Sequence, residues 1–206
     1  MLLVAMAGTH ELWRVDVATG AAGPVAGGRG EGLLDGLPAD ALLAQPAGLA
    51  TDGQRVWWTD AESSAVREAS AAALGVRHAP GGGEDAVRTL AGTGLFDFGH
   101  ADGPGDEARL QHPQGLAWVP PGATDSGDAG RLLVADSYND ALRWLDPRTR
   151  LVTTWQGGWQ GGLAEPGGVA VAGALAYVAD TNAHRVAVVE LATGAADTLA
   201  LVDARS

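Results

Sequence analysis

Hydrophobic and polar residues follow the same order in four places along the chain. In each place an apolar strand ends in a small or acidic residue, a short polar turn follows, and a second apolar strand begins. The four copies are Leu2–Trp13, Val56–Arg67, Leu133–Arg143 and Tyr177–Val186. Such repetition is typical of one supersecondary unit that is stacked because a single copy cannot bury a core. The pattern therefore predicts an array of antiparallel hairpins with negligible helix.

A second signature, Pro-x-Gly-apolar-Ala, precedes three of these hairpins. Its copies are Pro46–Ala50, Pro113–Ala117 and Pro166–Ala170. Proline is tolerated at the first residue of a strand, and glycine lets a neighbouring backbone approach closely. We therefore expect each copy to begin an innermost strand that packs near a common axis.

A further apolar segment follows each hairpin and predicts a fourth strand, so that each complete copy forms a four-stranded sheet. The first and last copies also share a Thr-Gly turn, at Thr19–Gly20 and Thr193–Gly194, which is a strong hairpin signal. Gly-rich polar inserts between the strands read as surface loops. We place the whole chain, residues 1–206, in one domain whose copies span approximately 1–27, 43–92, 110–156 and 163–201.

The first copy begins at its second strand, whereas the last copy continues to its fourth. We therefore expect an arc of about four blades from a longer ring, within the usual range of roughly 4 to 8 blades. The open ends of such an arc would expose unpaired strand edges and favour self-association.

Composition narrows the classes of partner. The chain of 206 residues is 46% apolar, carries a formal charge of −12 and has no cysteine. The negative charge argues against binding to nucleic acid or to an anionic membrane, because both need a basic face. The missing cysteine excludes disulfides and thiol catalysis. No apolar run approaches the ~18 residues of a membrane span, and we expect a cytoplasmic location.

The two signatures together resemble the NHL repeat, which forms the blades of NHL β-propellers. Within that family, Gly92–Gly99 and Ala179–Asn182 are similar to segments of proteins that join a thioredoxin-like domain to a six-bladed propeller. The resemblance implies an all-β NHL propeller, a partial six-bladed ring, and a fragment of a larger thioredoxin-like/NHL protein. Two departures matter. The cysteine-bearing part is absent, so no redox role carries over, and Ala61–Ser64 lacks the expected Asn.

Acidic residues recur at the turns of the last three hairpins, and amide residues recur at two of them. The carboxylates that end the second strand predict Asx-type turns, in which they accept backbone N–H groups of the following turn. Nearby amide side chains receive the same structural interpretation. These residues are Asp60, Asp136, Asp180, Asn139 and Asn182.

Gln45, His112 and Glu165 precede the prolines of the innermost strands and are the candidate ligand contacts. Equivalent positions in a propeller converge around one mouth of the central tunnel. There they could hold a divalent cation together with water, as in metal-dependent propeller enzymes; the alternative is a solvated tunnel lining. No zinc motif, catalytic triad order or phosphate loop is present. We therefore predict no catalytic residue, no metal ligand set and no cofactor.

Three aromatic residues in polar or Gly-rich loops, Phe96, Phe98 and Trp159, are candidate exposed anchors for a partner. The function that these patterns favour is a non-catalytic propeller scaffold that binds a protein or a small ligand. The alternative is a metal-assisted hydrolase or lyase at the tunnel mouth. RNA binding, a third class known among NHL propellers, needs a basic face that this composition does not supply.

Overall fold

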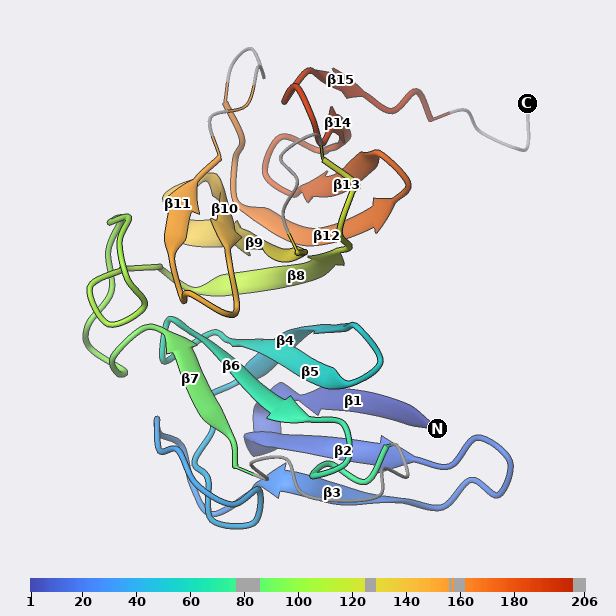
Figure 1. The fold of residues 1–206 in the computed structure, drawn as a ribbon, viewed down its shortest axis with the longest axis vertical. Helices are drawn as coiled ribbons and strands as arrows, with labels where there is room; N and C mark the ends of the chain where they lie inside the picture. The colour runs from blue at the N-terminus through green and yellow to red at the C-terminus, as the bar shows by residue number, and fades with distance from the viewer. Residues whose placement is uncertain (77–85, 125–128, 156, 158–161, 202–206) are drawn as a thin grey trace.

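The computed structural model describes residues 1–76, 86–124, 129–155, 157 and 162–201, and it is built from antiparallel sheets (Figure 1). Helix in these residues is limited to two short 3₁₀ segments, η1 (Ala7–Thr9) and η2 (Ser137–Asn139). This architecture confirms the predicted all-β class.

The strands form four sheets in chain order. The first sheet contains β1 (Leu2–Met6), β2 (Glu11–Val15) and β3 (Ala22–Gly27). The second contains β4 (Pro46–Thr51), β5 (Arg55–Asp60), β6 (Ala65–Ser70) and β7 (Arg88–Ala91). The third contains β8 (Pro113–Val119), β9 (Arg131–Asp136), β10 (Ala141–Leu145) and β11 (Val152–Thr154). The fourth contains β12 (Pro166–Ala172), β13 (Leu175–Asp180), β14 (Arg185–Glu190) and β15 (Ala196–Thr198).

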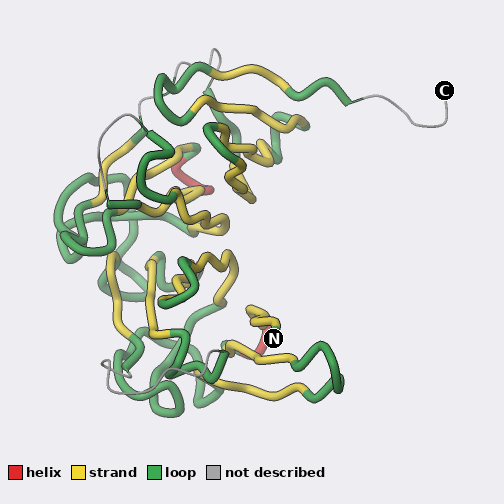
Figure 2. Tube along the Cα trace, turned by 45° about the vertical axis from the view of Figure 1, so that its right-hand side comes forward, coloured by secondary structure: helices red, strands yellow, loops and turns green. Residues whose placement is uncertain are grey.

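The sheets follow one another around an open arc, which is a partial propeller ring (Figure 2). On its inner side, strand β8 packs between β4 and β12. A Cβ added to Gly48 would lie 2.4 Å from the carbonyl oxygen of Gln114, and one added to Gly115 would lie 2.9 Å from the Cα of Gly168. The glycine of the first two Pro-x-Gly copies is therefore required because the neighbouring backbone passes so close, whereas a Cβ at Gly168 would lie 3.8 Å from Ala179, an ordinary contact.

Apolar side chains fill each junction between sheets. Along β9, Leu132 and Val134 face the second sheet, whereas Leu133 and Ala135 face the fourth. A sheet that is buried on both faces needs apolar residues at consecutive positions, which explains the unbroken hydrophobic runs of the sequence. Trp57 of the second sheet stacks on Trp118 of the third, with ring centroids 4.9 Å apart.

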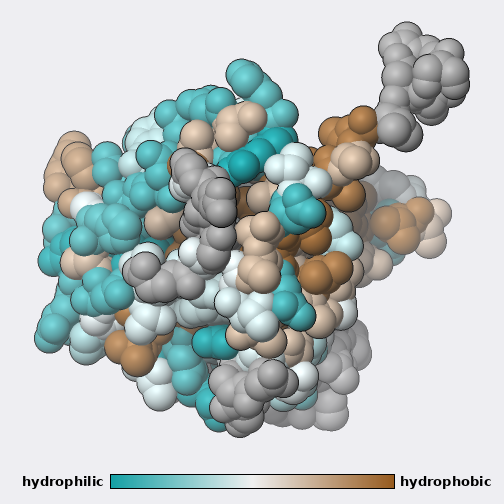
Figure 3. All heavy atoms as spheres, turned by 90° about the horizontal axis from the view of Figure 1, so that it is seen from above, coloured by the Kyte–Doolittle hydropathy of each residue, from teal (hydrophilic) through white to brown (hydrophobic). Residues whose placement is uncertain are grey.

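The outer face of the fourth sheet lacks such a neighbour among the described residues. Tyr177 pairs with Val188 across β13 and β14, in the register that Leu133 and Trp144 occupy in the third sheet. Leu133 and Trp144 are buried against the fourth sheet, but Tyr177 and Val188 are partly exposed. Figure 3 looks down on this end of the molecule and shows hydrophobic residues gathered among hydrophilic ones.

Candidate functional site

The strand-ending carboxylates of β5, β9 and β13 are fully buried and join three segments of their sheets. One carboxylate oxygen accepts a backbone N–H from the residues before the innermost strand, and the other pairs with an arginine of the next strand. The backbone bonds are Ala44 to Asp60, Gln111 to Asp136 and Ala164 to Asp180, each 2.7 Å long. The ion pairs are Arg67–Asp60 at 3.2 Å, Arg143–Asp136 at 2.7 Å and Arg185–Asp180 at 2.7 Å.

This geometry differs from the Asx-type turns that the sequence suggested for Asp60, Asp136 and Asp180. In the second sheet, the turn residues Ala61 and Glu62 donate their N–H groups to the carbonyl oxygens of Gln45 and Ala44. Because backbone carbonyl groups accept the N–H groups of the turn, the carboxylate of Asp60 can accept the N–H of Ala44, before the innermost strand. Of the two predicted amides, Asn139 donates to both Asp136 and the carbonyl of Gly99, at 2.8 and 2.6 Å. Asn182 is exposed and donates its backbone N–H to Ala164.

Arg67 and Arg143 are the residues that sequence reasoning missed. Both are fully buried, and each reaches a second carboxylate in the loop before its own sheet, Asp35 and Asp102 respectively. The recurring spacing of seven residues, Asp60 to Arg67 and Asp136 to Arg143, was the available signal. Burial raises the pKa of Asp60 to about 6 against the attraction of Arg67. Burial likewise raises the pKa of Asp136.

The residues predicted for the tunnel mouth occupy equivalent places, one before each innermost strand. Gln45, His112 and Glu165 all have positive φ angles, of 64°, 50° and 48°. Each donates its backbone N–H to a side chain in the hairpin turn of the preceding sheet. These bonds are Gln45 to His10 Nδ1 at 3.3 Å, His112 to Ser64 Oγ at 3.2 Å and Glu165 to Asp140 Oδ1 at 2.7 Å. We call these three bonds the junction latches.

Gln45, His112 and Glu165 therefore each lie at a different junction between consecutive sheets. The ring of His112 stacks on Tyr138, with centroids 4.6 Å apart, and its Nδ1 lies 3.9 Å from a carboxylate oxygen of Glu62. Within the described part of the chain, no three His, Asp or Glu side chains gather in a group that could hold a metal ion.

Two of the predicted anchors lie on the loop of residues 92–110, which we call the anchor loop. Phe96 is 92% exposed and Phe98 is 55% exposed. Side-chain and backbone bonds frame this loop: Asp97 binds Thr93 and the Nε of Arg109, and Gly99 bonds Leu110. The aromatic rings are thus displayed on an ordered support. The third anchor, Trp159, lies outside the described residues.

Comparisons with known proteins agree with this architecture. No protein-family model matches the chain. It is 35% identical to NHL repeat-containing protein 2 of Bos taurus and 34% identical to that of Homo sapiens, over 94% of this chain and 29% of each relative. It is 33% identical to Protein SUPPRESSOR OF QUENCHING 1, chloroplastic, of Arabidopsis thaliana, over 93% of this chain and 18% of that protein. The chain thus spans less than a third of these relatives.

Solved structures share the fold at low identity. An auxiliary nutrient binding protein from Bacteroides ovatus matches with a TM-score of 0.65 and 15% identity, over 96% of this chain and 45% of that one. Virginiamycin B lyase from Staphylococcus aureus matches with a TM-score of 0.53 and 9% identity, over 95% of this chain and 50% of that one. Among the described residues, no helix is long and apolar enough to cross a membrane. With its repeated signatures, its four propeller sheets and these relatives, the chain belongs to the NHL-repeat β-propeller family.

Proposed function

We propose that this chain is a non-catalytic propeller scaffold, which binds a protein partner through the anchor loop. The observation that carries the proposal is the exposure of Phe96, at 92%, on a loop that is fixed by Asp97, Arg109 and Gly99. An aromatic side chain that is exposed on an ordered support loses little conformational freedom on binding, so its burial contributes strongly to affinity.

The buried carboxylates support a scaffold over an enzyme. Asp60 and Asp136 have raised pKa values, which is a frequent property of catalytic acids. Both side chains are fully buried, however, and both are held by arginine and backbone donors of their own sheet. A substrate has no access to them, and their roles in the fold account for their pKa shifts.

The charges around the two phenylalanines indicate the chemistry of the partner. The anchor loop carries Asp97, Asp102, Asp106 and Glu107, of which Asp97 and Asp102 are paired with arginines. A partner that fits this loop presents an apolar pocket for Phe96 with basic residues at its rim. We further propose that the chain acts within a larger protein, since it spans 29% of its mammalian relatives and since Tyr177 and Val188, on the outer face of its fourth sheet, are partly exposed.

The proposal can be tested by selecting peptide ligands from a displayed library on the wild-type chain. Affinities of the selected peptides are then measured by calorimetry for Phe96→Ser and for Val17→Ser. Val17 is 71% exposed on a different hairpin and serves as the matched control. Phe96→Ser is expected to weaken binding by about tenfold or more, with Val17→Ser unchanged. Equal affinity of the Phe96→Ser variant for all selected peptides would contradict the proposal.

Metal analysis addresses the alternative of a metal-assisted hydrolase or lyase. The scaffold proposal expects no stoichiometric divalent cation in the purified protein or in the His112→Ala variant. A bound cation that is lost in His112→Ala would favour the alternative instead.

A further inference from the structure

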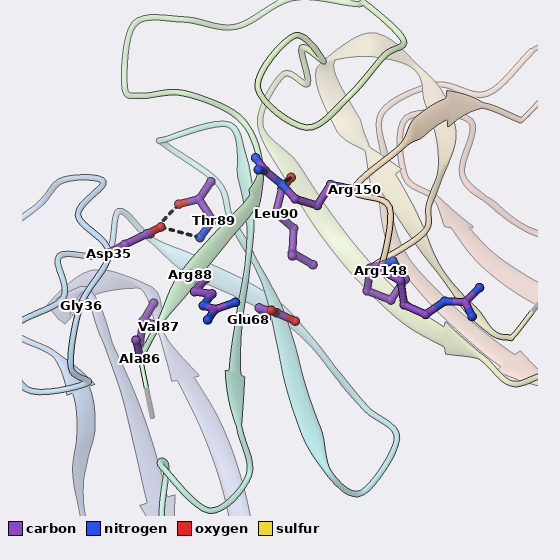
Figure 4. Close-up of a pocket in the computed structure, with 11 residues that line it drawn as sticks. Asp35, Gly36, Glu68, Ala86, Val87, Arg88, Thr89, Leu90, Arg148 and Arg150 are labelled. Atoms are coloured by element: carbon purple, nitrogen blue, oxygen red, sulfur yellow. Dashed lines mark hydrogen bonds between the residues drawn. The ribbon is translucent and has the colours of Figure 1, made fainter. Parts of the chain in front are cut away.

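A trough lies between the second and third sheets, at the end of β10 opposite to the turn that contains Tyr138. It consists of two adjoining cavities of about 610 and 570 Å³, which share Glu68, Pro147 and Arg148 in their linings. The larger cavity extends to Arg150 and is shown in Figure 4, whereas the smaller extends to Trp118. Cavities of this size are typical of ligand sites.

The lining of the trough reverses the charge balance of the chain. The chain has 25 acidic residues and 13 basic ones. Among the described residues that line the two cavities, arginines outnumber carboxylates. The arginines are Arg55, Arg88, Arg148 and Arg150, and the carboxylates are Asp35, Asp52 and Glu68. An anionic ligand is therefore attracted to the trough more than to the rest of the surface.

The lining carboxylates already have partners within the chain. Glu68 pairs with Arg55 at 2.6 Å and accepts the indole N–H of Trp57. Asp35 pairs with the buried Arg67 and accepts two hydrogen bonds from Thr89, as Figure 4 shows. Asp52 accepts the backbone N–H groups of its own turn. The pair between Glu68 and Arg55 neutralises both lining groups, and Asp35 is neutralised by Arg67, which does not line the trough.

Arg150 has an unusual backbone conformation at the edge of the trough. Its φ is 61°, and the equivalent position is glycine in two other hairpins, Gly20 with φ 76° and Gly194 with φ 72°. All three residues donate their N–H to the fourth residue before them, at 2.8 Å. An L-residue is uncommon in this region, although seven other described residues of the chain, among them Gln45 and Asp140, also adopt it. The Nε of Arg150 binds the carbonyl of Leu90, which holds its guanidinium over the junction.

We propose that the trough binds an acidic peptide segment. Its carboxylates pair with Arg150 and Arg148, and an aromatic side chain of the peptide lies in the smaller cavity against Trp118. Arginine recognises carboxylates through two parallel hydrogen bonds. The side chain of Arg148 is 62% exposed, points away from the other lining residues in Figure 4 and pairs with Asp146 at 3.6 Å. Binding therefore requires Arg148 to leave this exposed pair and turn toward the ligand. A peptide, rather than a small anion, spans both cavities and uses their apolar and cationic ends together.

This site is separate from the anchor loop and adds a second contact to the scaffold. The test is calorimetric titration of the whole chain with a short synthetic peptide of alternating Glu and Phe, and with its Gln and Phe counterpart. The variants are Arg150→Gly, the double variant Arg148→Ser with Arg150→Gly, and Arg14→Ser. Glycine at position 150 suits the local φ, so Arg150→Gly removes the cation and keeps the hairpin. Arg14 also binds a backbone carbonyl across a junction, that of Gly75, and controls for charge.

The proposal expects Arg150→Gly to bind the Glu peptide about tenfold more weakly, with a larger loss in the double variant. Arg14→Ser and Phe96→Ser are expected to bind as the wild type does, and the Gln peptide to bind weakly to every form. Equal binding of the Glu peptide to all variants would overturn the proposal. It would also be overturned if inorganic phosphate bound at millimolar concentration and the Glu peptide did not. Neither result depends on whether Phe96 anchors a partner.

Discussion

The carboxylate of Asp140, in a turn of the third sheet, accepts the backbone N–H of Glu165 at 2.7 Å as the chain enters the fourth sheet. His10 and Ser64 accept from Gln45 and His112 in the same way at the other two junctions. Three different side chains thus accept an equivalent backbone hydrogen bond. Each belongs to a residue at the end of its turn that itself has a left-handed backbone conformation. The latch depends on an acceptor atom and on backbone geometry rather than on one residue type.

The latch at Asp140 can be tested with a matched pair of variants. Asp140 has a φ of 52°, which Asn tolerates and Ala does not. Asp140→Asn keeps both the acceptor and the conformation, so we expect little change in the free energy of unfolding. Asp140→Ala loses both and should be about 1–2 kcal/mol less stable than Asp140→Asn in urea denaturation. Equal stabilities would show that the latch contributes nothing.

The close approach of the innermost strands makes Gly115 sensitive to substitution. A methyl group there meets the backbone of Gly168 and Val169 at 2.9 Å. We expect Gly115→Ala to destabilise the protein by about 1–3 kcal/mol, because the strands must separate. Gly8→Ala is the control, since nothing lies within 4 Å of a Cβ at that position. Thermal unfolding of the two variants compares them directly, and a smaller loss at Gly115 would contradict the packing that we describe.

Arg143 has two carboxylate partners that differ in burial. Asp136 is fully buried, whereas the side chain of Asp102 is 49% exposed. Removing the buried partner leaves the buried Arg143 with one half-exposed carboxylate and also breaks the bonds that Asp136 accepts from Gln111 and Asn139, so Asp136→Ala should cost about 3 kcal/mol of unfolding free energy or more. Asp102→Ala should cost about 1 kcal/mol or less, because exposed pairs are weak. Urea denaturation measures both, and a larger loss for Asp102→Ala would refute this order.

The raised pKa of Asp60 predicts a pH dependence of unusual sign. Burial raises its pKa from 3.8 to about 6 in the folded protein. Between these values the folded state holds the proton and the unfolded state releases it, so stability decreases as the pH rises from about 4 to 6 and is constant above. The full effect is on the order of 2–3 kcal/mol. The raised pKa of Asp136 acts in the same direction.

Asp60→Asn removes the titrating carboxyl group, so comparison of its urea denaturation with that of the wild type tests this prediction. We expect the urea midpoint of the wild type to fall as the pH rises from about 4 to 6, and that of Asp60→Asn to fall less. Parallel pH profiles would show that another group, or the overall charge of −12, causes the dependence.

The outer face of the fourth sheet, which no described residue covers, predicts self-association. Val188 and Tyr177 hold positions that are buried in the third sheet. In sedimentation velocity we expect the wild type to show a mass that increases with concentration, and Val188→Glu to remain monomeric. Thr198→Glu places the same charge on an exposed site of β15 and should behave as the wild type. Identical behaviour of all three forms would contradict association through this face.

Sequence reasoning recovered the repeated sheets because their signals are local. The Pro-x-Gly signature and the hairpin turns are both read within a few residues, and both specify backbone conformations directly. The exposure of Phe96 and Phe98 was likewise predictable, because aromatic residues in a polar loop have no strand to bury them.

The contacts between distant segments could not be read in this way. The acceptor for Gln45 lies 35 residues earlier and that for His112 lies 48 residues earlier, and the two acceptors, His10 and Ser64, differ in residue type. The strand-ending Asp60 was recognised, but its bond to Ala44 depends on how the chain enters the sheet. The trough is formed by two sheets that meet, so no single repeat carries its pattern.

The junction latches and the buried Asp–Arg pairs lie in the hairpin turns, between strands, or at the start of the innermost strands. The tip of the anchor loop, with Phe96, contributes to neither. Substitutions at this tip therefore leave the junction latches and the buried Asp–Arg pairs unchanged. A variant at Phe96 therefore reports on binding alone, because its folding stability is expected to match that of the wild type.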